Sequence, residues 1–314
     1  MILVTGGMGF IGLHTVRALL DAGENVVVSY HSSYRVPAFW KDEVGKRVMI
    51  EQLDVTSAHD VMALAQKHKV TGIVHLAMPG AAGLSPAEDY RTSMYGLLNV
   101  MEAARFVNVK RLTFASSSTL YQGLPAGPYV EDMPLPIESA NQTAAFKKAC
   151  EVLLFHYADR TGLDVGAVRM RAVYGPMYYS LMNMPSRFCH AAVKGVEPNY
   201  GPAGAPYAED TNDFSNVHDV AAVFQRVTTA DKLPYRTYNV SQGEEATFQD
   251  LADAVKAVEP GFTVNLKPGQ NPKGNPPNNY LSADRVKEVF GYTPQFGVVK
   301  GVADYIGWLR TNPL

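Results

Sequence analysis

The sequence TGGMGFIG at residues 5–12 stands between an apolar run and a helical pattern. Residues 2–4 predict a buried strand, and residues 11–22 predict an amphipathic helix that ends near Gly23. Glycines between a strand and a helix allow a tight turn, which brings backbone amides close to a pyrophosphate at the helix N-terminus. The segment therefore predicts a dinucleotide-binding turn. The predicted contacts are Gly6, Gly9, Phe10, Ile11 and Gly12.

Strands and helices continue to alternate along the first half of the chain. Further strands are predicted at 25–29, 48–53, 72–77, 111–116 and 164–170, and long helices at 59–69, 90–107 and 144–161. This alternation predicts an α/β fold, a Rossmann-type doubly wound parallel sheet. We expect a dinucleotide-binding domain over 1–170, to which 216–240 return, and a smaller C-terminal substrate-binding part over 171–215 and 241–314.

Composition excludes several classes of protein. The chain has 314 residues, 46% of them hydrophobic, and a net charge of -2, which predicts a packed core and argues against nucleic-acid or membrane-surface binding. Cys150 and Cys189 are too few for a disulfide scaffold, and no metal-ligand spacing is present, so no metal site is expected. No basic leader or membrane-spanning apolar run precedes the first strand, which predicts a cytoplasmic protein.

Six later segments extend the pattern that begins with the glycine turn. They are LDV at 53–55, VHLA at 74–77, FASSSTLY at 114–121, YGP at 174–176, DFSNVHDVA at 213–221 and YNV at 238–240. Together they resemble the extended short-chain dehydrogenase/reductase family, in its NAD-dependent epimerase/dehydratase group. The resemblance implies an enzyme that dimerises through the helices near 90–107 and 144–161. It also implies cofactor contacts at Asp54, Val55, Leu76, Ala77, Ser116, Lys147 and Val173.

The choice between NAD and NADP depends on the end of the second strand. An acidic residue there would bind the ribose 2′-hydroxyl of NAD, but this chain has Tyr30. The residues that follow, His31, Ser32 and Arg35, can surround a 2′-phosphate. We therefore expect NAD or NADP, with NADP favoured by a small margin; the alternative is that these residues form a solvated loop.

The resemblance implies a catalytic serine, a tyrosine, and a lysine four residues after the tyrosine. Ser117 and Lys147 match, but Thr143 stands where the tyrosine belongs, and a threonine hydroxyl cannot act as a resting base near neutral pH. Three hypotheses follow: another group moves the proton, the redox step is slow or handles its proton differently, or the protein binds dinucleotide without turnover. The candidate replacements are Tyr121, Tyr174, Tyr178 or a water held by Thr143.

The substrate region departs from sugar-nucleotide relatives at two positions. Ala172 and Asn212 stand where those relatives have the asparagine and arginine that hold a diphosphate, and residues 177–213 are rich in Met, Tyr and Phe. This predicts an NAD(P)-dependent oxidoreductase or epimerase acting on a non-nucleotide, largely apolar carbonyl or alcohol. The alternatives are a sugar-nucleotide epimerase with an altered phosphate site and a non-catalytic dinucleotide sensor. Predicted substrate contacts are Ser118, Tyr121, Tyr174, Tyr178 and Tyr179.

Overall fold

The structure, a computed structural model, describes residues 1–78, 85–201 and 204–312, and the chain divides into two compact units. The first unit comprises Met1–Gln122, Pro136–Arg169 and Ala221–Tyr238. The second comprises Gly123–Leu135, Met170–Val220 and Asn239–Leu314. No helix in the described ranges is long and apolar enough to cross a membrane.

A seven-stranded sheet forms the centre of the first unit, in the order β3-β2-β1-β4-β5-β6-β8. The strands are β1 (Ile2–Thr5), β2 (Val26–Tyr30), β3 (Val48–Gln52), β4 (Gly72–His75), β5 (Arg111–Ser117), β6 (Val165–Met170) and β8 (Thr237–Val240). The pairings from β3 through β5 are parallel. The predicted doubly wound sheet is thus confirmed. The strand order reverses between β1 and β4, the place where such sheets bind ligands.

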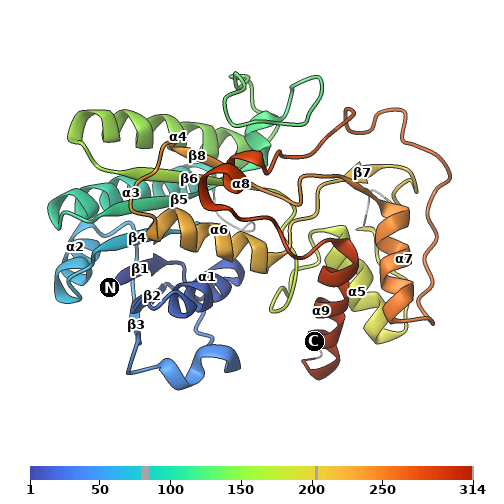
Figure 1. Ribbon diagram of the computed structural model, residues 1–314, viewed down its shortest axis with the longest axis horizontal. Coiled ribbons are helices and arrows are strands. Elements are labelled where there is room, and N and C mark those ends of the chain that lie inside the picture. Colours follow the sequence, from blue (N-terminus) through green and yellow to red (C-terminus); the bar gives the residue numbers. More distant parts are fainter. Residues whose placement is uncertain (79–84, 202–203, 313–314) are drawn as a thin grey trace. The chain divides into compact units, whose positions relative to one another are not determined.

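Helices cover both faces of this sheet because its strands are apolar on both sides. All three valines of β2, residues 26–28, are fully buried. In Figure 1, α3 and α4 lie on one side of the sheet, and α1 and α6 lie on the other. The helices are α1 (Phe10–Asp21), α2 (Ala58–Lys67), α3 (Pro86–Phe106), α4 (Gln142–Thr161) and α6 (Val217–Thr229). One core cluster joins α3, β5 and α4 through fully buried Leu97, Leu112 and Leu154.

The second unit packs its own helices around a separate apolar core. Its elements are α5 (Met184–Lys194), β7 (Thr211–Asn212), β9 (Ala246–Thr247), α7 (Phe248–Val258), α8 (Asp284–Phe290) and α9 (Val298–Thr311). Phe188, Leu251 and Ile306 bring α5, α7 and α9 together in that core. The short helices η1 (Ala38–Glu43) and η2 (Ser118–Tyr121) complete the described structure.

Helix α5 lies within residues 174–215, where glycines and prolines predict a loop-rich stretch. The helix has ordinary boundaries: Asn183 caps its N-terminus by accepting from the Ser186 amide at 3.0 Å, and Gly195 ends it with φ of 66°. Pro185 sits in the first turn, where a proline loses no hydrogen bond. The breakers at 175–176 and 201–206 therefore flank the helix instead of excluding it.

The two faces of α9 predict very different responses to truncation. Ile306 is fully buried, so Ile306→Ala should lower the free energy of unfolding by about 2–5 kcal/mol, because it leaves a cavity in the second core. Val299 lies on the same helix and is 66% exposed, so Val299→Ala should change it by no more than about 0.5 kcal/mol. Urea unfolding followed by circular dichroism measures both, and equal effects would contradict this packing.

Candidate active site: a dinucleotide pocket and a catalytic strand

The glycine turn after β1 is closed by its own backbone. The Gly9 amide donates to the Gly6 carbonyl at 2.9 Å, and the Gly7 amide donates to the Ser29 carbonyl of β2 at 2.9 Å. Gly6 has φ of +65°, and a Cβ there would lie 2.9 Å from the backbone of Ala77. Only glycine fits this left-handed, close approach. The turn therefore presses directly against the segment that follows β4.

The start of α1 offers backbone amides to a ligand. Gly9 is the N-cap residue, and no side chain caps the helix. A Cβ on Gly12 would lie 2.6 Å from the Gly6 carbonyl oxygen, so this glycine lets the helix begin against the turn. An uncapped helix N-terminus, with its positive dipole end, suits a pyrophosphate. The turn thus has the properties required to hold the phosphates of a dinucleotide.

A cavity of about 630 Å³ opens beside this turn, at the carboxyl ends of β1, β2 and β4. It lies in the first unit, and its volume falls in the range of small-molecule and cofactor sites. The lining residues are Gly6, Met8, Gly9, Ser29, Tyr30, His31, Ser32, Ser33, Leu53, Asp54, Val55, Thr56, Leu76, Ala77, Met78 and Thr92. The cavity suits a dinucleotide, because glycine amides lie at one end and both apolar and polar side chains line the rest.

Many of the predicted cofactor contacts line this cavity. They are Gly6, Gly9, His31, Ser32, Asp54, Val55, Leu76 and Ala77. Phe10, Ile11 and Gly12 instead form the first turn of α1, and Arg35 lies in an exposed stretch. Ser116 belongs to β5, Lys147 belongs to α4, and Val173 belongs to the second unit. Four further lining residues are absent from the predicted contacts: Met8, Thr56, Met78 and Thr92. The first three are adjacent in sequence to a predicted contact, and that adjacency is the signal by which they could have been predicted.

Asp54 is the carboxylate among the residues that line this cavity, and its oxygen is already hydrogen-bonded. Asp54 Oδ1 accepts from the Thr56 amide at 2.8 Å and from Thr56 Oγ1 at 2.7 Å. These hydrogen bonds lower the pKa of Asp54. His31 and Ser32 line the same cavity without an acidic neighbour at position 30. The pocket thus has hydroxyl and imidazole groups at the end of β2, where an acid would select a free ribose hydroxyl.

Ser117 ends β5 and caps η2. Its Oγ accepts from the Thr119 amide at 3.2 Å and from Thr119 Oγ1 at 3.0 Å. Because both bonds fill the acceptor side of the hydroxyl, its own proton is left to donate. Ser118 and Tyr121, two predicted substrate contacts, follow in η2 and are both buried.

Lys147 projects from α4 back to β5. Its Nζ donates to the Ala115 carbonyl at 2.6 Å and lies 4.7 Å from the centre of the Phe114 ring. Burial lowers the pKa of this ammonium to about 8, although Cys150 and Glu151 act in the opposite direction. Thr143 lies one turn earlier on the same helix and is half-buried. Ser117, Thr143 and Lys147 therefore all belong to the first unit, on β5 and the start of α4.

A buried hydrogen-bond network supports this strand and helix. Glu151 accepts from Arg169 Nη2 at 2.7 Å and Nε at 3.0 Å, and Ser116 Oγ donates to the same carboxylate. Arg169 Nη1 donates to the Tyr121 hydroxyl at 2.7 Å. All four side chains are almost inaccessible to solvent. The network fixes β5, η2, α4 and β6 to one another and occupies the Tyr121 hydroxyl that was a candidate for the proton.

The other predicted tyrosines lie in the second unit. Burial raises the pKa of Tyr174 far above its ordinary value, and burial also raises the pKa of half-buried Tyr178. A phenol with a raised pKa is a poorer base near neutral pH. Tyr179, the last of the set, packs edge-on against Trp308. None of these surroundings activates a phenol.

In the second unit, Arg171 lies beside Asn212, the residue that stands where an arginine was expected. Arg171 Nε donates to Asn212 Oδ1 at 3.0 Å, and its Nη1 donates to Asn279 Oδ1 at 2.8 Å. Burial lowers the pKa of Arg171, while Asp213, Tyr129 and Glu245 counteract that effect. The guanidinium is thus oriented by two neutral amides.

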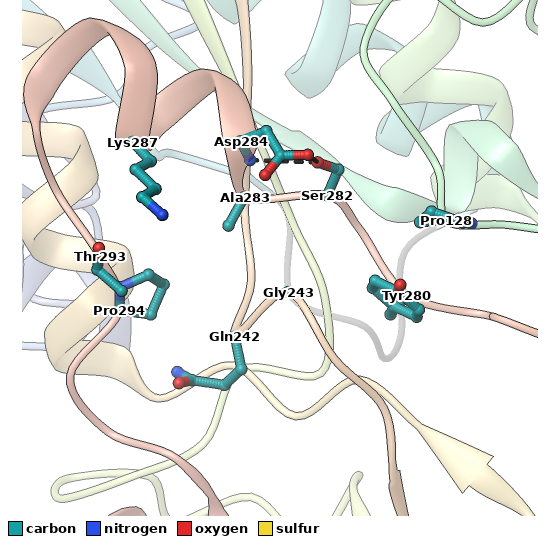
Figure 2. A pocket seen from close by; sticks show the side chains of 10 residues that line it. All are labelled: Pro128, Gln242, Gly243, Tyr280, Ser282, Ala283, Asp284, Lys287, Thr293 and Pro294. Atoms are coloured by element: carbon teal, nitrogen blue, oxygen red, sulfur yellow. Dashed lines mark hydrogen bonds between the residues drawn. The ribbon is translucent and has the colours of Figure 1, made fainter.

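A smaller hollow of about 310 Å³ lies wholly within the second unit, beside α8 (Figure 2). Ser282 Oγ donates to Asp284 at 2.8 Å on its wall, and Gln242 donates to Asp219 at 2.8 Å. None of the predicted site residues lines it. No group of three His, Cys, Asp or Glu side chains that could hold a metal occurs in the described ranges.

Comparison with known proteins assigns this chain to a family. The model of the NAD dependent epimerase/dehydratase family matches residues 2–241. The chain belongs to this family. Within it, a UDP-glucose 4-epimerase of Mycolicibacterium smegmatis is 29% identical over 99% of this chain and 98% of that relative. The family assignment confirms the resemblance drawn from the sequence, and it makes the chain an NAD-dependent enzyme.

Solved structures of family members have the same fold. The UDP-glucose 4-epimerase of Thermus thermophilus, in complex with NAD, is 26% identical, with a TM-score of 0.80 and 98% coverage of both chains. WbmH of Bordetella bronchiseptica, in complex with NAD⁺, is 23% identical, with a TM-score of 0.80. The match covers 100% of this chain and 99% of the WbmH chain, and at that identity it shows a shared fold.

The glycine turn gives a direct test of the dinucleotide pocket. Gly12→Ala places a Cβ 2.6 Å from the Gly6 carbonyl and 2.7 Å from Gly7 Cα, so the turn must shift, and we expect at least a tenfold weaker affinity for NAD. Gly261→Ala is the control, because its Cβ meets no atom within 4 Å. Isothermal titration calorimetry measures both variants. Unchanged affinity in Gly12→Ala would show that the dinucleotide binds elsewhere.

Proposed function

We propose that this protein is a sugar-nucleotide epimerase that works through a bound nicotinamide dinucleotide, with a rebuilt phosphate site. The observation that carries the proposal is the combination of the cavity beside the glycine turn with Ser117 and Lys147 on the neighbouring strand and helix. Similarity to UDP-glucose 4-epimerases over almost the full length of both chains supports the substrate class. The alternative of a non-nucleotide, apolar substrate gains no support from these relatives.

In this proposal the residues of the first unit bind and orient the reactants. Gly6, Gly9 and the first turn of α1 would hold the pyrophosphate, and Leu76 and Ala77 would line the path toward β5. A nicotinamide bound there would supply the redox chemistry at the substrate carbinol. Ser117 would donate its free proton to the substrate oxygen, since its acceptor side is filled by Thr119.

The second unit carries a candidate phosphate-binding group of its own. Ala172 lacks the amide, and Asn212 lacks the positive charge, that sugar-nucleotide relatives are expected to have at these positions. Arg171 is next to Ala172 in sequence, and its guanidinium donates to Asn212. Two neutral amide acceptors orient the guanidinium and leave its Nη2 available for further hydrogen bonds, and a planar guanidinium suits phosphate oxygens. We infer that the positive charge has moved from position 212 to position 171.

Ligand binding tests the substrate class. With NAD present, we expect UDP and UDP-sugars to bind by calorimetry, and the sugars to interconvert at one carbinol when followed by NMR. Arg171→Ala should weaken UDP affinity at least tenfold, because it removes the charge, and Arg171→Lys should weaken it less. Oxidation of simple apolar alcohols without any binding of nucleotide diphosphates would instead support the non-nucleotide alternative.

The same pocket suggests how the dinucleotide is chosen. The family is NAD-dependent, and we propose that this member also accepts NADP, because His31 and Ser32 line the cavity at the end of β2 without an acid at position 30. Ser32→Asp should lower NADP affinity at least tenfold, by repulsion of the 2′-phosphate, and leave NAD affinity within about threefold. Paired titrations with both dinucleotides measure this; an equal loss for both would argue against a 2′-phosphate at position 32.

Self-association is a further part of the proposal. Tyr95, Leu98 and Phe106 on α3, and Val152 and Leu153 on α4, are exposed in the single chain. Exposed apolar side chains on two adjacent helices favour burial against a second copy. The homodimer expected from the sequence stays a prediction.

A further inference from the structure

The structure leaves the proton step without the phenol that the family uses, and it restricts the substitutes. Thr143 has an alcohol whose pKa is far too high for a resting base. The Tyr121 hydroxyl is buried and accepts from Arg169 at 2.7 Å. The Ser117 hydroxyl is held by Thr119 as an acceptor and has a proton to give, not to take. The amine of Lys147 remains as a candidate in the first unit, because it bonds to the backbone of the same strand at Ala115, two residues before Ser117.

We propose that the Lys147 amine itself takes and returns the substrate hydroxyl proton, in place of the missing tyrosine. The inference rests on the proposed dinucleotide chemistry but not on the identity of the sugar. The amine lies at the carboxyl end of β5, the edge of the sheet where parallel α/β proteins bind their ligands. Its single hydrogen-bond partner in the described chain is a backbone carbonyl, which leaves the other two N–H positions of the ammonium for substrate.

The groups that face Lys147 explain why its amine can lose a proton. Burial lowers the pKa of His75 to about 3, so the imidazole on β4 is neutral at neutral pH. Burial raises the pKa of Cys150 to about 11, so that thiol is neutral as well. Glu151 is the carboxylate whose charge acts on Lys147, and both of its oxygens are engaged by Arg169. No carboxylate is hydrogen-bonded to the ammonium in the described chain, and the effect of burial outweighs the opposing effect of Glu151, which favours the neutral amine.

The resulting pKa, about 8, suits a proton carrier near neutral pH. In the oxidative direction the substrate O–H bond breaks and its proton joins the nitrogen lone pair, giving an ammonium. The carbinol C–H hydrogen leaves with its electron pair to the nicotinamide, and the carbon becomes a carbonyl. In the return direction the ammonium gives its proton to the oxygen as the hydrogen is delivered to the carbon, so the amine is regenerated after each cycle.

The network around Glu151 acts as the positioning device for this amine. If Glu151 were free, its carboxylate, one helical turn from Lys147, would stabilise the ammonium and raise its pKa. Arg169 on β6 neutralises it, and Ser116 and Tyr121 complete the buried network. The neutral, correctly placed lysine thus depends on a salt bridge that does not touch it.

A direct titration of the amine tests the inference without any substrate. Protein labelled with ¹³C at the lysine ε-carbons is titrated by NMR, and Lys147→Arg assigns the resonance. We expect a midpoint near 8, against about 10.4 for ordinary lysines. A midpoint at 10 or above would overturn the proposal.

Turnover in matched variants tests the role. Lys147→Arg keeps the charge but cannot deprotonate, so it should bind NAD within about threefold of the unsubstituted protein and lose at least a hundredfold in turnover. Lys148→Arg is the control: this neighbouring lysine bonds to the Glu138 carbonyl at 2.5 Å, and its replacement should leave turnover unchanged. Lys147→Ala should regain activity with added methylamine. More than a tenth of normal turnover in Lys147→Arg would overturn the inference.

The pH dependence separates this inference from the proposed function. The rate of the oxidative step should rise with pH to a plateau above about 8, because the amine must be neutral to accept the proton. Thr143→Tyr should move that rise to lower pH, since a phenolate paired with the lysine would then carry the proton. Turnover of a substrate other than a sugar nucleotide with the same pH rise would reject the substrate class alone. Dinucleotide binding with no turnover of any alcohol would reject both.

Discussion

The close approach of the glycine turn to the end of β4 is the constraint on which the rest of the site depends. Gly6 lies so near the backbone of Ala77 that a side chain cannot fit between them. This contact joins the two strands at which the sheet reverses its order, and it sets the end of the cavity beside the uncapped start of α1. The features that suit a phosphate here belong to the backbone, so they do not depend on the side chain at position 143.

The end of β5 and the start of α4 show which groups surround the position where the family's tyrosine is replaced by Thr143. The buried pair of Glu151 and Arg169 satisfies both charges within hydrogen-bond distance, and the remaining effect of Glu151 on Lys147 is smaller than that of burial. A lysine that is buried beside a carbonyl and a ring, without a carboxylate partner, has a lowered pKa for reasons of solvation. The lowered pKa of Lys147 is what makes its amine a candidate proton carrier in the proposal above.

The second unit differs from the first in how its polar groups are used. Asp213 is fully buried, and burial raises its pKa to about 7 even though the Leu281 amide donates to it. Arg171 is oriented by amides from Asn212 and Asn279 instead of by a carboxylate. These features make a polar core in which charge is held by hydrogen bonds across loops.

The sequence by itself determined the turn, the alternation of strands and helices, the family, and the absence of a tyrosine at position 143, because each is encoded in residues that are adjacent or one helical turn apart. It did not predict α5, since glycines and prolines mark loop positions without revealing that a capped helix lies between them. Only the tertiary structure decided the partners of Lys147, Glu151 and Arg171. These partners come from residues 18 to 108 positions away, and which groups meet across such separations depends on packing, which local sequence patterns do not encode.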